Sequence, residues 1–215
     1  MFRVKKEKII YSKEPNNPLA YTDNMNIIYT RFAVMYEMFI LVFPLWKKWI
    51  SSVLEHVQGE KLLDISFGPG YLFKKYPESM SVNGLDYNKK VVARGKDKYP
   101  NVDIVEGNVY AMPYDDESFD TVVNTMSFSG YPDGKAAVSE MMRVLRKDGV
   151  LLLMDYAYPE HRNPAGYLLV KTIEKSGNII RDLDELFSNM SLNYEKQVIG
   201  GFSSIVLYII KKEEV

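Results

Sequence analysis

Over most of the chain after residue 60, short apolar runs alternate with amphipathic segments. The runs of strand type, several of them apolar on both faces, are 61–65, 81–85, 102–105, 121–124 and 150–155. Helical patterns lie between them at 71–76, 89–98 and 135–145. Strands of this kind that alternate with helices are typical of a parallel sheet covered by helices on both faces. The pattern therefore predicts an α/β protein.

The segments near the two ends of the chain follow other patterns. Apolar residues from Phe32 to Trp49 recur mostly at spacings of three and four, which predicts a helix packed on a core. Charges and Pro44 interrupt this stretch, so its uncharged part is too short for a membrane span and no stable membrane insertion is expected. Near the C-terminus, the apolar runs 192–198 and 203–210 predict an antiparallel hairpin at the edge of the sheet.

The composition narrows the possible functions. The 215 residues are 47% hydrophobic and 26% charged, as in ordinary globular proteins. The 27 basic and 28 acidic residues give a net charge of −1, so no overall basic field favours nucleic acid as a partner. The absence of cysteine excludes thiolate metal sites and thiol nucleophiles and favours a cytoplasmic protein. The basic residues near the start are not followed by an apolar run, so no secretory signal peptide is expected.

A glycine-rich turn follows the first predicted strand, in the sequence Asp64-Ile65-Ser66-Phe67-Gly68-Pro69-Gly70. Glycines in such a turn allow the backbone to approach a ligand closely. The second predicted strand ends at Asp86, where a carboxylate can accept hydrogen bonds from ribose hydroxyls. The turn alone is compatible with a purely structural role. Together with the spaced acid, it indicates a nucleoside pocket.

The acid at the start of this turn distinguishes between nucleoside ligands. The phosphate-binding pattern G-x-x-x-x-G-K-[ST] is absent from the chain. A carboxylate at Asp64 would repel a pyrophosphate but attract the cationic amine of an amino acid. S-adenosylmethionine (SAM) combines ribose, adenine, an amine and a sulfonium cation, and therefore suits both acids.

Five motifs, in order, resemble those of class I SAM-dependent methyltransferases, the broad group that includes the ubiquinone/menaquinone-biosynthesis C-methyltransferases. The turn resembles acid-x-G-x-G-x-G, and Asp86 matches the family's ribose-binding acid. Residues 106–114 and 118–123 resemble G-D-A-x-x-L-P-F followed by S-F-D-x-V. Residues 143–149 resemble R-V-L-K-P-G-G, and residues 29–37 resemble Y-x-x-x-A-x-x-Y-[DE]. The resemblance covers the chain from about Tyr29 to the C-terminus.

This resemblance implies a fold, a cofactor and a set of binding residues. The fold is a doubly wound, Rossmann-like, mostly parallel seven-stranded sheet with an antiparallel C-terminal hairpin. Residues 1–58 form an N-terminal helical cap that closes over the cofactor, and residues 59–215 form one compact SAM-binding domain. Asn108 and Val109 border the adenine. The residues expected to bind SAM are Asp64, Ser66, Gly68, Gly70, Asp86, Tyr87, Asn108, Val109, Asn124, Tyr29 and Tyr36.

Three positions depart from the family pattern. Ser66 stands at the usual first glycine, Asn108 at the usual aspartate, and Lys147-Asp148 at the usual Pro-Gly. A serine fits the turn if its backbone keeps a β-region dihedral, and an asparagine carbonyl can accept the adenine amino hydrogen. These departures leave a non-catalytic SAM-fold binding or assembly protein as the alternative function. A Rossmann dehydrogenase is disfavoured, because the glycine spacing is not G-x-G-x-x-G.

Methyl transfer from a sulfonium mainly needs alignment and a dry pocket, so a dedicated base is optional. His56 precedes the first strand and is expected to be structural, whereas His161 follows the fifth strand near the ligand-binding edge. His161 is therefore the candidate base, with a solvated loop as the alternative. No metal site is predicted, because the acids at 115–117 suit a solvated turn. Apolar and aromatic residues in the segments expected around that edge predict a small apolar or aromatic acceptor, and the oligomeric state stays open.

Overall fold

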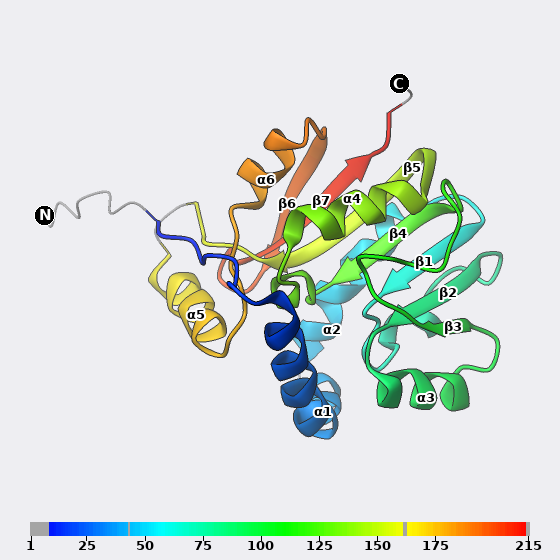
Figure 1. Cartoon of the computed structure of the whole chain (residues 1–215), viewed down its shortest axis with the longest axis horizontal. Coiled ribbons are helices and arrows are strands. Elements are labelled where there is room, and N and C mark those ends of the chain that lie inside the picture. The colour runs from blue at the N-terminus through cyan, green and yellow to red at the C-terminus, as the bar shows by residue number, and fades with distance from the viewer. Residues whose placement is uncertain (1–8, 43, 161–162, 214–215) are drawn as a thin grey trace, which may run out of the picture.

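The centre of the computed structural model is a seven-stranded sheet with the strand order β3-β2-β1-β4-β5-β7-β6 (Figure 1). The structure describes residues 9–42, 44–160 and 163–213, without the side chains of residues 32–42. The strands are β1 Lys61–Ile65, β2 Ser81–Asp86, β3 Asp103–Glu106, β4 Phe119–Thr125, β5 Leu145–Tyr156, β6 Tyr194–Gly200 and β7 Ile205–Lys211. Strands β1 to β5 run parallel, whereas β7 is antiparallel to both β5 and β6. The predicted fold class, including the hairpin at the edge, is confirmed.

Helices cover both faces of this sheet. The helices in the described part of the chain are α1 Pro18–Val42, α2 Pro44–Ser51, α3 Lys89–Lys98, α4 Gly134–Val144, α5 Pro164–Lys175 and α6 Leu183–Asn189, with short 3-10 helices η1 Ser52–His56, η2 Tyr71–Lys74 and η3 Phe128–Gly130. Successive strand residues point to opposite faces of a sheet. Leu63 therefore packs in a core with α4 and α6, whereas its neighbour Leu62 packs in a second core with α2 and α3. The strand order reverses between β1 and β4, which creates a crevice for ligands at their carboxyl ends.

Local signals in the sequence explain several element boundaries. The bounds of β1 and α3 are those predicted. α3 begins after Asn88, whose side-chain oxygen accepts the backbone N–H groups of Lys90 and Val91 at 2.9 and 3.3 Å. This cap fixes the start of α3 directly behind the end of β2, and so fixes the position of the acid that ends β2.

Other elements differ from the prediction. The helix predicted over 32–49 is two helices, because a proline at position 44 cannot donate the backbone hydrogen bond of a continuous helix. The helix predicted at 71–76 is only the 3-10 helix η2, and β5 begins at Leu145 rather than at 150. Helices α5 and α6 were not predicted, although capping residues precede both. None of the described helices is both long and apolar enough to cross a lipid bilayer.

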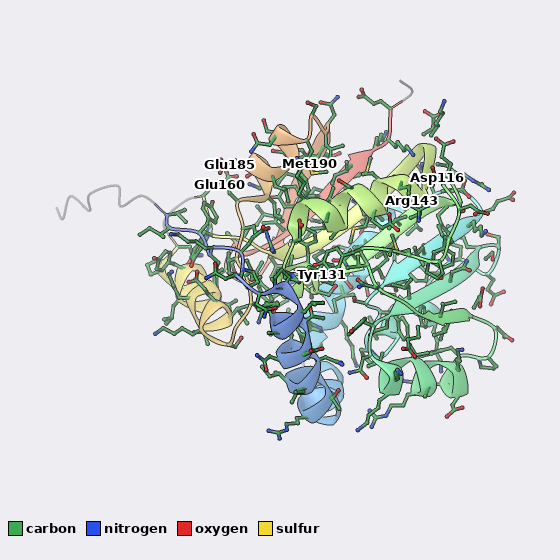
Figure 2. All side chains as sticks on the ribbon, viewed as in Figure 1. Asp116, Tyr131, Arg143, Glu160, Glu185 and Met190 are labelled. Atoms are coloured by element: carbon green, nitrogen blue, oxygen red, sulfur yellow. The ribbon has the colours of Figure 1, made fainter. Side chains whose placement is uncertain are left out.

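The arginine of the motif at 143–149 has a structural role. Arg143 on α4 donates to the backbone carbonyls of Met112 and Tyr114 at 3.2 and 2.8 Å and pairs with Asp116 at 2.7 Å, and Figure 2 labels this pair. A guanidinium offers several donors in a fixed fork, which suits this bridging role. Arg143 thus holds the segment between β3 and β4 against the end of α4, near the starts of β4 and β5.

Candidate functional site

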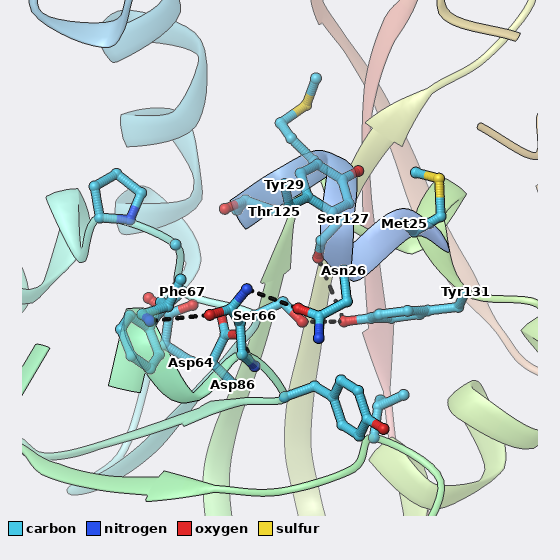
Figure 3. Close-up of a pocket in the computed structure, with 18 of the residues that line it drawn as sticks. Met25, Asn26, Tyr29, Asp64, Ser66, Phe67, Asp86, Thr125, Ser127 and Tyr131 are labelled. Carbon is cyan, nitrogen blue, oxygen red and sulfur yellow. Dashed lines mark hydrogen bonds between the residues drawn. The ribbon is translucent and has the colours of Figure 1, made fainter. Parts of the chain in front are cut away.

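A cavity of about 680 Å³ lies at the carboxyl ends of β1, β2 and β4. The glycine-rich turn, the ends of β2 and β3 and the loop after β4 form its walls, together with α1, α2, α3 and the segment after α5 (Figure 3). Most of the lining surface is apolar, and polar and charged side chains from several elements also reach it. Pockets of this size and character bind small organic molecules. The site therefore lies where the strand order reverses, as expected.

Asp64, at the end of β1, is a buried carboxylate in the wall of the cavity. It is 2% exposed, and its Oδ2 accepts a hydrogen bond from the Tyr76 hydroxyl at 2.9 Å. Burial raises the pKa of Asp64 to about 7, although the bond from Tyr76 opposes this rise, and the nearby Asp86 charge adds to it. A cationic ligand would relieve this electrostatic cost. The sequence analysis missed Tyr76, because only the folded chain brings its hydroxyl to the carboxylate.

Asp86, at the end of β2, is the second buried acid of the cavity. It is 8% exposed, and its Oδ1 accepts the backbone N–H of Asn88 at 2.9 Å. Burial raises the pKa of Asp86 to about 6, while hydrogen bonds from the backbone of Asn88, Gly68 and Tyr87 oppose that rise. The structure thus brings the two predicted acids to one cavity, with the glycine-rich turn between them.

The two glycines of the turn have different surroundings. Gly68 has a φ of +55°, lines the cavity, and has no atom within 4 Å of the position that a Cβ would occupy. Gly70 has a φ of +68°, but a Cβ there would lie 2.5 Å from Cε2 of Tyr99 and 2.7 Å from Cδ2 of Phe73. Gly70 is absent from the lining of this cavity, so its surroundings indicate a packing role.

The backbone of Ser66 is not in the β-region conformation expected from the sequence. Its φ is +55°, in the left-handed region that favours glycine. Such a conformation costs a non-glycine residue about 1–2 kcal/mol. The Ser66 hydroxyl lies 2.7 Å from the Tyr131 hydroxyl, and a hydrogen bond of this kind offsets about 1 kcal/mol of that conformational cost.

Asp148 also replaces a family glycine at a φ of +59°, a conformation that aspartate tolerates better than most residues.

The residues expected near adenine lie at the ends of β2 and β3. Val109 is buried in the cavity wall, and Tyr87 is half-exposed and also lines the cavity. Asn108 lines it too, and its Oδ1 accepts the backbone N–H of Tyr110 at 3.0 Å. An amide oxygen accepts two hydrogen bonds, so this one retains a lone pair for a ligand.

Asn124, at the end of β4, lies behind the cavity wall and is not part of its lining. It is fully buried, and its Nδ2 lies 3.1 Å from the carbonyl oxygen of Ile65 and 2.8 Å from both Ser127 Oγ and the Tyr131 hydroxyl. Ser127 and Tyr131 do line the cavity. Asn124 therefore orients the loop after β4, and Tyr131 belongs to the aromatic residues after the fourth strand that the sequence predicts at this edge.

Helix α1 lies over the cavity and is fixed by hydrogen bonds to the domain beneath it. The Asn88 side-chain amide donates to Asn26 Oδ1 and Thr30 Oγ1 on α1, both at 2.7 Å. Tyr29, one of the predicted cap residues, is half-exposed and lines the cavity. The other, Tyr36, belongs to α1, but its side chain lies outside the described part of the structure. Asn88 therefore connects the neighbourhood of Asp86 to the cap.

The candidate histidines are placed as follows. His56 lies in η1 and is absent from the lining of the cavity, whereas His161 lies outside the described residues. Among the side chains that the structure describes, no group of three or more acidic, histidine or cysteine residues could hold a metal ion.

Comparisons with known proteins bear on this site. A family model described as a methyltransferase domain matches residues 63–153. The chain is 28% identical over 115 residues to a demethylmenaquinone methyltransferase of Renibacterium salmoninarum, covering 53% of this chain and 48% of that protein. It is 28% identical over 154 residues to the ubiquinone/menaquinone biosynthesis C-methyltransferase UbiE of Shewanella halifaxensis, covering 65% and 61% respectively. The matched regions thus span about half to two thirds of the length of these relatives.

Solved structures show the same fold. One of them is a SAM-dependent methyltransferase of Thermotoga maritima, described as a possible histamine N-methyltransferase. It superposes with a TM-score of 0.71 at 19% identity, covering 86% of this chain and 99% of that one. At this identity the likeness concerns the fold alone.

Proposed function

The chain carries a class I SAM-dependent methyltransferase domain of the ubiquinone/menaquinone group, as its motifs predicted, and on that premise we propose that it transfers a methyl group from SAM to a small acceptor. The acceptor is apolar or aromatic. One observation carries this proposal: both acids of the SAM motifs, Asp64 and Asp86, line a single cavity beneath the cap helix α1. SAM is the cofactor of this class of domain.

The residues present fit SAM. Asp86 is placed to accept the ribose hydroxyls, and Asp64 lies where the cationic amine would offset the cost of its buried charge. The open space beside Gly68 allows the turn to lie against the cofactor, and Val109 offers an apolar contact for adenine. When bound, SAM supplies a methyl group that its sulfonium already activates. The protein's residues then align the partners and exclude water.

The part of the cavity beneath α1 is the proposed acceptor compartment. Buried Met25 and half-exposed Tyr29 on α1 face this space, together with Ile173 from α5 (Figure 3). Polar groups lie there too, since Asn178 Oδ1 accepts hydrogen bonds from the hydroxyls of Ser129 at 3.2 Å and Tyr29 at 3.5 Å. Apolar walls with one or two polar groups suit a ring that bears oxygen. The names of the two relatives point to quinone-like acceptors of this kind.

The remaining parts of the proposal follow from the sequence. The cap comprises residues 1–58 and the SAM-binding domain residues 59–215. The net charge of −1 supports a small molecule, rather than nucleic acid, as the partner. The absence of cysteine supports a cytoplasmic location. His161 remains the proposed base, and alignment alone is the alternative.

The test combines binding with methyl transfer. Isothermal titration with SAM establishes cofactor binding. Label transfer from methyl-labelled SAM is then measured with quinol-like, phenolic and amine acceptors, and with RNA, DNA and bulk protein at two salt concentrations. We expect transfer to at least one small ring acceptor and none to the polymers. Salt-sensitive labelling of RNA alone would overturn the acceptor class, and SAM binding without transfer in any arm would favour a non-catalytic binding protein.

A further inference from the structure

The Tyr131 hydroxyl lies in the wall of the cavity that both buried acids line, beside the glycine-rich turn. It lies 2.7 Å from the Ser66 hydroxyl, two residues beyond Asp64 in the glycine-rich turn. Burial raises the pKa of Tyr131 above its usual range, and the charge of Asp86 adds to this rise. Figure 3 shows the phenol ring entering the cavity beneath Met25 of α1. The hydroxyl therefore lies next to the turn that follows Asp64, in the cavity that holds both anchors proposed for the cofactor.

The ring of Tyr131 is held from several sides. Phe128 contacts it edge-on at a centroid distance of 5.7 Å, and Tyr110 does so at 6.5 Å. The Tyr131 backbone carbonyl accepts a hydrogen bond from the buried guanidinium of Arg181. These contacts fix the direction in which the phenol points, so the position of its oxygen is defined before any ligand binds.

The hydrogen bonds of this hydroxyl leave acceptor capacity for a ligand. The Asn124 amide donates to the phenol oxygen at 2.8 Å, and Ser66 and Ser127 hydroxyls lie 2.7 and 3.4 Å from it. A phenol has one proton to give and two lone pairs that accept. With the phenol proton assigned to Ser66 and one lone pair occupied by Asn124, the second lone pair is shared between the Ser127 hydroxyl, 3.4 Å away, and the cavity. Burial keeps the phenol neutral at neutral pH, because it raises the pKa above its usual range.

From this arrangement we propose that the Tyr131 oxygen recognises the positive charge of the SAM sulfonium, with Ser66 and Asn124 as its positioning residues. The inference rests on the proposed function. In SAM, the sulfonium joins the ribose to the amino-acid chain. If Asp86 holds the ribose and Asp64 attracts the amine, the sulfonium lies between the two acids, near the glycine-rich turn whose Ser66 contacts the Tyr131 hydroxyl. A lone pair and a cation attract each other strongly in a site that excludes water.

This role explains why a serine at a strained φ occurs in place of glycine. A glycine at position 66 would relax the backbone but would leave the Tyr131 hydroxyl without its nearest partner. The serine thus fixes the hydroxyl at the cost of local strain, as strained residues at functional sites often do.

Comparing SAM with S-adenosylhomocysteine tests the inference. The two ligands share ribose, adenine and amine, but the second lacks the methyl group and the sulfonium charge. We would measure both dissociation constants by isothermal titration for the wild type, Tyr131→Phe and Tyr110→Phe. Tyr110 is the matched control, because it also lines the cavity but its hydroxyl accepts the backbone N–H of Asp133 at 3.1 Å.

We expect Tyr131→Phe to weaken SAM binding about tenfold, or by about 1.4 kcal/mol, and S-adenosylhomocysteine binding less than twofold. Tyr110→Phe should change both affinities by the same factor. Equal losses for both ligands in Tyr131→Phe, or no loss for either, would overturn the inference and assign Tyr131 a structural role.

A second variant covers the case in which Tyr131→Phe does not fold. Glycine adopts a positive φ without strain, so Ser66→Gly should fold. It should lower the preference for SAM over S-adenosylhomocysteine by about threefold, because the Tyr131 hydroxyl loses its partner. An unchanged preference in Ser66→Gly would contradict the positioning role. If the wild type binds neither ligand, the proposed function itself fails and the inference falls with it.

Discussion

Replacing the buried acid Asp64 with asparagine is expected to stabilise the ligand-free protein while weakening SAM binding. The carboxylate is 2% exposed and accepts one hydrogen bond from a side chain, that of Tyr76. Burial is the main reason that its pKa rises from 3.8 to about 7. At pH 8 this rise corresponds to a cost of about 4 kcal/mol for keeping the ionised group in the folded protein. An asparagine has no charge to bury.

The net gain is smaller than this cost. The asparagine Oδ1 can still accept the Tyr76 hydroxyl, but its NH₂ group needs new acceptors, and a buried unpaired donor costs about 1–3 kcal/mol. We therefore expect Asp64→Asn to raise the free energy of unfolding by about 1–3 kcal/mol at pH 8. The folded state binds the Asp64 proton more tightly than the unfolded state, so the wild type gains stability from this group as the pH falls through 7 towards 4. The advantage of the variant should shrink by about 2–3 kcal/mol between pH 8 and pH 5.

Urea denaturation at the two pH values, without SAM, measures this difference. Asp120→Asn is the matched control, because its change in the free energy of unfolding at pH 8 should have the opposite sign. The Asp120 carboxylate accepts the backbone N–H groups of Glu60 and Lys61 and a bond from Arg146, which together hold its pKa below the usual value despite partial burial. The contribution of the Asp120 carboxylate to the free energy of unfolding is present at pH 8 and is lost as the pH falls below about 4. Asp120→Asn should therefore be less stable than the wild type at pH 8. If Asp64→Asn is destabilised equally at both pH values, the argument about the buried charge is refuted.

Three further outcomes follow from the site. Asp86→Ala should weaken SAM binding by about 2–4 kcal/mol in isothermal titration, because two hydrogen bonds to a charged acceptor are lost, and unchanged affinity would reject its ribose role. Gly68→Val should lose SAM binding yet keep a native circular-dichroism spectrum, whereas Gly70→Ala should mainly lower the melting temperature, since its Cβ would meet Tyr99. Retained binding in Gly68→Val would count against the pocket. Asn26→Ala removes one bond between α1 and Asn88 without touching the cap of α3, so hydrogen exchange should quicken in α1 but not in α3.

Much of the fold and of the cofactor site was readable because it depends on local signals. Apolar runs and their spacing located every strand, and β1 and α3 have the predicted bounds. The turn before Gly70 and the acid ending β2 were recognisable from residue type and spacing alone. The carboxyl ends of neighbouring parallel strands must meet at one edge, so Asp64 and Asp86 were bound to lie near each other. Helices α5 and α6 were missed even though capping residues at Asn163 and Asp182 precede them.

The sequence by itself therefore determined the strand pattern, the fold class and the two acids, while the tertiary structure decided which groups complete the site. The hydroxyl of Tyr76 reaches Asp64, Asn88 holds α1 over the cavity, and Tyr131 meets Ser66 across 65 positions of chain. Hydrogen bonds of this kind leave no periodic pattern in the sequence, because each depends on the distance and direction between two atoms from different elements. The positive φ of Ser66 was hidden for the same reason: the bond that accompanies it comes from a loop that only the folded sheet brings near.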